Sequence, residues 1–131
     1  MASIPVYLLR VDGAVTLLWA SEQVLRSIKE ESGAREKVHE KLATFSKAGL
    51  RSLVGSENSA VRREPSDGKP VYRVWHKSGS NYRMFGQFSG QNDFILLDAF
   101  MRGRGQYTAS EMKRINRVGF LIWHKVTKTN V

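Results

Sequence analysis

The stretch from Val71 to Phe100, VYRVWHKSGSNYRMFGQFSGQNDFILLDAF, most constrains the fold of this chain. Apolar and polar residues alternate with a period of two over 71–77 and 82–88, which predicts two β-strands. Residues 94–100, FILLDAF, are apolar on both faces and predict a strand in the middle of a sheet. Short segments rich in Ser, Gly and Asn separate these runs, so we expect an antiparallel β-meander.

Helical spacing precedes this sheet. Ser21 can accept a hydrogen bond from an unpaired backbone N–H, which favours a helix over 21–31. Apolar residues recur every three or four positions over 34–48 and predict a second helix, which Gly49 can end. The short connection between the two segments predicts a helical hairpin.

A final helix is predicted after the sheet. Thr108 or Ser110 can cap its start. Apolar residues then share one helical face as far as residue 126: Met112, Ile115, Gly119, Ile122 and Val126. These patterns together predict one α+β domain over 1–131, with an N-terminal helical hairpin, an antiparallel β-meander sheet and a C-terminal helix.

Two segments give weaker signals. The apolar runs 5–11 and 14–20 flank Asp12-Gly13, a pair that favours the tight turn of a β-hairpin. Residues 51–69 read as a connecting segment, and Pro65-Ser66-Asp67-Gly68 marks a turn just before the meander.

The positive charge of the chain is concentrated in its second half. The net charge is +9; residues 1–61 hold eight basic and seven acidic residues, whereas residues 62–131 hold thirteen basic and five acidic residues. Such an uneven distribution favours a phosphate-rich or acidic partner over a merely solvated surface.

The composition also excludes several classes of site. The chain has no cysteine, which rules out disulfides, thiolate metal ligands and thiol catalysis. Its three histidines are scattered and no paired-carboxylate motif occurs, so we expect no metal and no cofactor. The beginning of the sequence lacks a signal-peptide pattern and the apolar runs are too short to span a bilayer. We therefore expect a cytoplasmic protein.

Basic residues at matching positions of two strands indicate an anion site. Alternation places Arg73 and Arg83 on one face of the sheet if the register permits, where their guanidinium groups could bind a phosphate. Arg102 and Arg104 follow in a Gly-rich loop that could close over the same ligand. The alternative is that the strand arginines cover exposed sheet and pair with acids such as Asp98.

Two further side chains could take part in chemistry at this site. Tyr107 could hydrogen-bond to or exchange a proton with a phosphodiester, or stack on a base, but it could equally pack on the helix start. His76 could act as a general acid or base, although a lone histidine is more often structural. Lys77, Lys113 and Arg117 are additional candidates for contacts to RNA.

The spacing of these residues resembles a family of bacterial toxins. Tyr72-Arg73, Tyr82-Arg83, the run Leu96 to Phe100, a basic loop and a capped helix with Glu111 follow one another as in the RelE/HigB/ParE-type toxins of toxin–antitoxin pairs. The resemblance covers roughly residues 34–118. The chain differs from the family in its longer N-terminus, its apolar tail GFLIWHKV and its MRGRGQYT in place of a Lys-Lys-Thr motif.

The resemblance implies a RelE-like microbial ribonuclease fold and a metal-independent endoribonuclease that cuts mRNA in the ribosome. It implies Arg73, Arg83 and Tyr107 as catalytic residues, to which His76 is added as a candidate general acid or base. The expected partners are mRNA, the ribosome and a cognate antitoxin, and the sequence does not determine the oligomeric state. The alternative is a non-enzymatic basic protein that inhibits gyrase, as the ParE branch does, or binds nucleic acid. No helix-turn-helix pattern supports sequence-specific reading of DNA.

Overall fold

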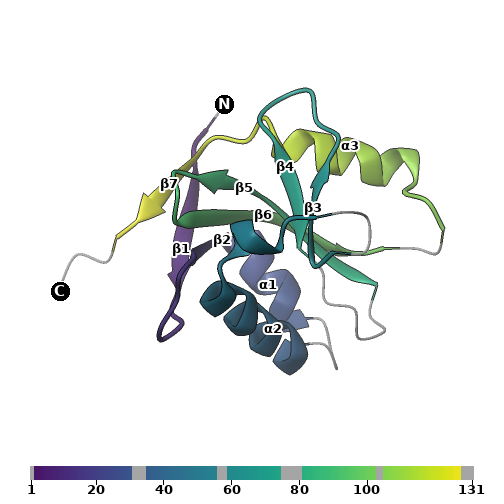
Figure 1. Cartoon of the computed structure of the whole chain (residues 1–131). Helices are drawn as coiled ribbons and strands as arrows, with labels where there is room; N and C mark the ends of the chain where they lie inside the picture. Colours follow the sequence, from purple (N-terminus) through teal and green to yellow (C-terminus); the bar gives the residue numbers. More distant parts are fainter. Residues whose placement is uncertain (1, 31–34, 56–58, 75–80, 103–104, 128–131) are drawn as a thin grey trace.

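The computed structural model describes residues 2–30, 35–55, 59–74, 81–102 and 105–127. In these parts of the chain it has the predicted α+β class, with a seven-stranded sheet and three α-helices (Figure 1). None of the helices in the described parts is long and apolar enough to cross a membrane. The elements are, in chain order, β1 (Ile4–Leu9), β2 (Leu17–Ser21), α1 (Glu22–Glu30), α2 (Arg35–Ala48), the 3₁₀ turn η1 (Leu50–Leu53), β3 (Val61–Glu64), β4 (Val71–Val74), β5 (Tyr82–Ser89), β6 (Asp93–Met101), α3 (Ala109–Val118) and β7 (Trp123–Val126).

The sheet is mixed, whereas the sequence predicted an antiparallel one. The strand order is β3-β4-β5-β6-β2-β1-β7, and the pairs from β3 to β6 and the hairpin β1–β2 are antiparallel. The pairs β2–β6 and β1–β7 are parallel. The prediction was wrong here because the N-terminal hairpin joins the meander alongside β6. That position leaves β6 in the middle of the sheet and buried, as its apolar sequence predicted.

Helices cover both faces of the sheet. In Figure 1, α1 and α2 lie on one side of the sheet and α3 lies on the other. The first core packs Val24, Ile28, Val38 and Leu42 of the two N-terminal helices against the sheet. The second core packs Ile115 and Val118 of α3 against the opposite face. Because both faces are covered, a strand such as β6 can carry apolar residues on both faces.

Local signals set the ends of the N-terminal elements. Gly13 adopts a left-handed φ of 74° in the turn between β1 and β2. The Ser21 hydroxyl accepts a hydrogen bond from Val24 N at 3.3 Å and caps α1, as predicted. Gly49, with a φ of 89°, ends α2 and donates its N–H to Phe45 O at 2.9 Å. The connection predicted between the two helices, 32–33, lies outside the described residues.

The predicted C-terminal helix is too long. Helix α3 ends at Val118, and residues 123–126 form β7 beside β1. Gly119 packs against the loop before β4, where a Cβ atom would lie 2.6 Å from the carbonyl oxygen of Lys69. Past Gly119 the apolar residues Ile122 and Val126 are exposed, so their spacing does not mark a buried helical face. Pairing with β1 makes residues 123–126 a strand.

The segment predicted as a connection, 51–69, contains a strand and most of a 3₁₀ turn. Residues 61–64 form β3, which pairs with β4 across the turn that starts at Pro65. Only Val61 among these residues is apolar, so the segment has little strand character of its own. Its partner strand imposes the conformation, and the sequence prediction missed it for this reason.

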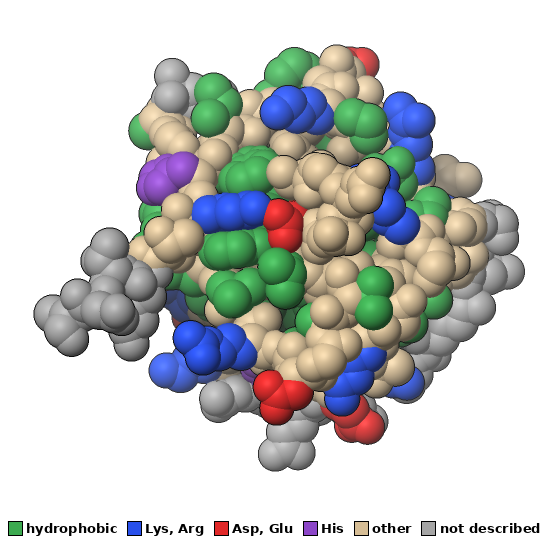
Figure 2. Space-filling view, turned by 60° about the vertical axis from the view of Figure 1, so that its left-hand side comes forward, with side chains coloured by type: hydrophobic (Ala, Val, Ile, Leu, Met, Phe, Trp, Pro, Cys, Tyr) green, Lys and Arg blue, Asp and Glu red, His purple; other side chains and the backbone are tan. Residues whose placement is uncertain are grey.

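The β1–β7 side of the sheet carries an apolar area with one ion pair on it. Figure 2 brings this side forward and shows a basic and an acidic side chain side by side among apolar groups. Lys125 of β7 pairs with Asp93 of β6 and lies over the Trp19 ring, 5.0 Å from its centroid. The lysine stem thus covers aromatic surface while its charge is compensated.

Candidate active site

Register brings three arginines from adjacent strands to one face of the sheet. Arg73 of β4 pairs with Arg62 of β3 on one side and with Phe85 of β5 on the other. Arg83 precedes Phe85 by two residues in the same strand, so it projects to the same face. The predicted shared face of Arg73 and Arg83 is confirmed, and Arg62 joins it.

These arginines line a cavity of about 410 Å³ between the sheet and the start of α3. The cavity size lies within the range of small-molecule sites. Besides the three strand arginines, its walls consist of Glu64, Pro65, Arg102, Gln106, Tyr107, Met112 and Ile115. Of the predicted site residues, Arg73, Arg83, Arg102 and Tyr107 therefore meet in one place.

The innermost charges of the cavity are buried. The residues Arg73 and Arg83 are only 2% and 4% exposed. The Arg73 Nη2 group donates to Ser59 O at 2.7 Å, which fixes the side chain against the loop before β3. Glu64 is also buried, and its carboxylate accepts a 2.6 Å hydrogen bond from Arg62 Nε. The walls of the cavity thus carry one acidic side chain and four arginines, so the net charge of the site is positive.

Burial and mutual repulsion perturb the strand arginines. Burial is the main cause that lowers the pKa of Arg73, and the nearby charge of Arg62 lowers it further. Burial likewise lowers the pKa of Arg83 to about 10, with smaller contributions from Arg73 and Arg102. Both side chains remain cationic at neutral pH. A bound anion would compensate these charges, so the site is electrostatically suited to phosphate.

Tyr107 lines the cavity close to the strand arginines. The Arg102 guanidinium carbon lies 4.7 Å from the centroid of its ring, and the Phe85 ring meets it edge-on at 6.3 Å. Tyr107 is close enough to Arg73 to interact with it, yet its buried hydroxyl makes no hydrogen bond of ordinary geometry with the described residues. Burial, followed by the charge of Glu64, raises the pKa of Tyr107. The hydroxyl is therefore protonated at neutral pH and available to donate.

The start of α3 fixes the position of Tyr107. The Thr108 hydroxyl accepts from Glu111 N at 3.1 Å, and the Glu111 carboxylate accepts from Thr108 N at 2.8 Å. This reciprocal arrangement is a capping box and it holds the residue directly after Tyr107. The sequence predicted a cap at Thr108 or Ser110, and the structure selects Thr108.

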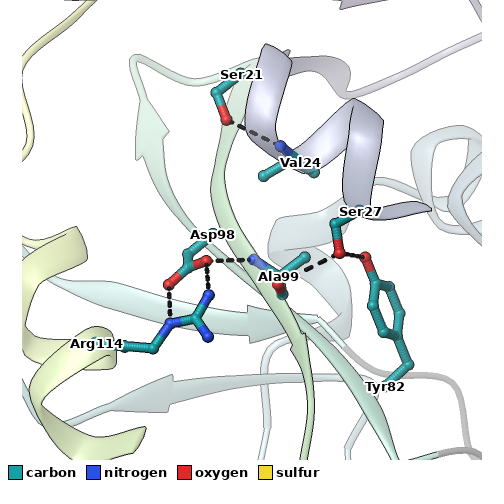
Figure 3. A network of polar contacts seen from close by, with 7 residues as sticks. All are labelled: Ser21, Val24, Ser27, Tyr82, Asp98, Ala99 and Arg114. Carbon is teal, nitrogen blue, oxygen red and sulfur yellow. Dashed lines mark hydrogen bonds and ion pairs between the residues drawn. The ribbon is translucent and has the colours of Figure 1, made fainter. Parts of the chain in front are cut away.

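An ion pair fastens α3 to the centre of the sheet (Figure 3). Asp98 of β6 accepts from Arg114 Nη2 at 2.6 Å and from Arg114 Nε at 3.0 Å. The same carboxylate accepts from Ala99 N at 2.8 Å. On the other face of the sheet, the Ser27 and Tyr82 hydroxyls are hydrogen-bonded at 2.8 Å. Asp98 thus pairs with the helix, and the alternative in which it neutralises the strand arginines is not what the structure shows.

Two further predicted residues, Lys113 and Arg117, do not line this cavity. Three others, His76, Lys77 and Arg104, lie outside the described residues. Lys113 is exposed on α3 and does not line the cavity. Arg117 is also exposed and lines a second hollow, of about 600 Å³, beside β1 and α1.

Sequence reasoning missed Arg62 and Glu64. Both lie in β3, which the sequence did not predict. The turn at Pro65 was a usable signal, because a turn before one strand of an antiparallel pair implies a second strand on its other side. Searches with the chain against protein-family models, curated proteins and solved structures found no match.

Proposed function

We propose that this chain is the toxin of a toxin–antitoxin pair and a metal-independent endoribonuclease that cuts mRNA in the ribosome. One observation carries the proposal: four arginines, a carboxylate and a tyrosine hydroxyl line one cavity of about 410 Å³. Cations placed where negative charge develops are the main catalytic requirement of phosphodiester cleavage by an internal hydroxyl.

The side chains of the cavity suffice for a balanced reaction. Glu64 takes the proton of a ribose 2′-hydroxyl, and the 2′-oxygen attacks the adjacent phosphorus. The bond from phosphorus to the 5′-oxygen breaks, and Tyr107 donates a proton to that leaving oxygen. Arg73 and Arg83 stabilise the additional negative charge on the phosphoryl oxygens. The products are a 2′,3′-cyclic phosphate and a 5′-hydroxyl end.

The resemblance to the RelE/HigB/ParE-type toxins supports the biological part of the proposal. It suggests a RelE-like arrangement in which the N-terminal helices form a hairpin beside the meander. In this proposal the protein acts in the cytoplasm on ribosome-bound mRNA, and a cognate antitoxin neutralises it. Both partners are expectations from the resemblance and from the positive net charge of +9.

The test is to map mRNA 5′ ends in a bacterial translation extract with the purified protein and three variants. Arg83→Ala removes a cation and Glu64→Gln removes the proposed base. Arg63→Ala is the matched control, because Arg63 lies in the same sheet but is exposed and alternates to the other face. We expect new ends, in phase with codons and dependent on translation, with the wild type and the control only.

The same experiment separates the enzyme from the non-enzymatic alternative. Intact mRNA with folded wild-type protein would refute the nuclease and favour a binder. Gyrase supercoiling would then be assayed directly. Affinity for nucleic acid would be measured at several salt concentrations. If contacts to phosphate dominate binding, the affinity should fall steeply as the salt concentration rises.

A further inference from the structure

The cavity has two halves of different chemistry. Arg62, Arg73 and Arg83 form the sheet side together with Glu64. Pro65 and two residues of α3, Met112 and Ile115, add apolar surface to the walls of the same cavity. A site for phosphate alone needs only the first half, so the second half calls for a separate explanation.

The volume of the cavity also indicates a ligand larger than a phosphate group. A water molecule occupies about 30 Å³ in the liquid. The few heavy atoms of a phosphate group therefore fill only a minor part of the cavity of about 410 Å³. The remaining space adjoins the apolar wall, where a charged group would lose hydration without compensation. A flat, weakly polar group attached to the phosphate fits that space better.

The surroundings of Met112 favour such a ligand. Met112 is 53% exposed although it lines the cavity with the buried Ile115. A methionine side chain is polarisable and adapts to the face of an aromatic ring. Tyr107 is the less suitable platform for stacking, because the Arg102 guanidinium already lies over its ring. Gln106 adds a group that can both donate and accept hydrogen bonds at the same cavity.

We propose that the cavity binds one whole nucleotide of single-stranded RNA, with its phosphate on the arginines and its base against Pro65, Met112 and Ile115. Gln106 contacts the polar edge of that base. This inference rests on the proposed function, since it takes the arginines as the phosphate site. Only an unpaired nucleotide can turn its base into such a pocket, so duplex RNA is excluded as a ligand.

The test compares ligands by isothermal titration calorimetry with the full chain. Inorganic phosphate, ribose 5-phosphate and the common ribonucleoside 3′-monophosphates are titrated at one ionic strength. Because packing of a base contributes affinity beyond the phosphate, we expect at least one nucleotide to bind about tenfold or more tighter than phosphate. Met112→Ser should remove most of that gain and leave the phosphate affinity unchanged.

Ile122→Ser is the matched control, because Ile122 is 54% exposed but lies next to β7, away from the cavity. It should bind every ligand as the wild type does. Equal affinity for phosphate and nucleotides, or an equal loss of both in Met112→Ser, would overturn the base site and leave the arginine site standing. Failure of the wild type to bind phosphate or nucleotide would overturn the anion site itself, and with it the proposed function.

Discussion

Replacing Arg83 by methionine should stabilise the folded protein while it removes the activity. Burial lowers the pKa of Arg83 from its usual value to about 10, which means that the folded state disfavours the charged guanidinium. One pKa unit corresponds to about 1.36 kcal/mol, so the penalty has an upper limit of about 3 kcal/mol. Water in the cavity screens part of it, and we expect about 1–2 kcal/mol of stabilisation in Arg83→Met. Methionine retains much of the packing of the arginine stem.

The direction of the pKa shift determines how the stability difference between Arg83→Met and the wild type depends on pH. The pKa of Arg83 is lower in the folded state than in the unfolded state, so the penalty is fully present below about pH 10. It is lost as the pH rises above this folded-state pKa, because the unfolded chain then binds more protons than the folded chain. The difference between variant and wild type should therefore be constant between pH 7 and 9.

Urea unfolding and thermal denaturation measure this difference. A gain of 1–2 kcal/mol corresponds to a rise in Tm of about 4–8 °C for a chain of this size. Arg63→Met, at an exposed position of β3, should change neither quantity. A destabilisation of Arg83→Met by about 1 kcal/mol or more would refute the reasoning, since the charge would then be a net contributor to folding. Phosphate should raise the Tm of the wild type and not that of Arg83→Met.

Three other perturbations test the site and its support. Burial raises the pKa of the Tyr107 hydroxyl, so this tyrosine should ionise at a higher pH than an ordinary tyrosine when the titration is followed by ultraviolet absorbance. Tyr107→Phe should remove this high-pH step. An unchanged titration curve would show that the hydroxyl is not buried. Asp98→Asn should cost about 1–3 kcal/mol in urea unfolding, since it weakens the two charge-assisted hydrogen bonds from Arg114; unchanged stability would mean that the pair does not fasten α3. Gly86→Ala should destabilise by about 1–3 kcal/mol, because the new Cβ atom would lie 2.0 Å from Ile95 O; an unchanged urea midpoint would contradict this close approach.

Local patterns predicted the parts of the fold that depend on local geometry. Alternation predicted β4 and β5, and the run that is apolar on both faces predicted β6. The period of two placed Arg73 and Arg83 on one face before their register was known. Capping chemistry identified the start of α1 and the start of α3. Four of the ten residues that line the cavity were predicted from the sequence: Arg73, Arg83, Arg102 and Tyr107.

The parts that failed depend on partners far away in the sequence. The last strand, 123–126, has an apolar spacing that suits a helix, and only its pairing with Ile4–Leu9 makes it a strand. Glu64 was missed because β3 carries three charged residues in four, and β4 determines its conformation. A single sequence shows neither pairing, so the carboxylate of the site could not be predicted from it.

The pairing of β1 with β7 also bears on how the chain folds during its synthesis. The strands that carry the arginines, β3 to β5, pair with near neighbours in sequence and can form early. Strand β1 acquires its second neighbour only when residues 123–126 have been made, and until then one side of it has no partner. An unpaired strand edge promotes association with other chains. Truncation before Trp123 should therefore leave a chain with a formed arginine cavity and an increased tendency to aggregate.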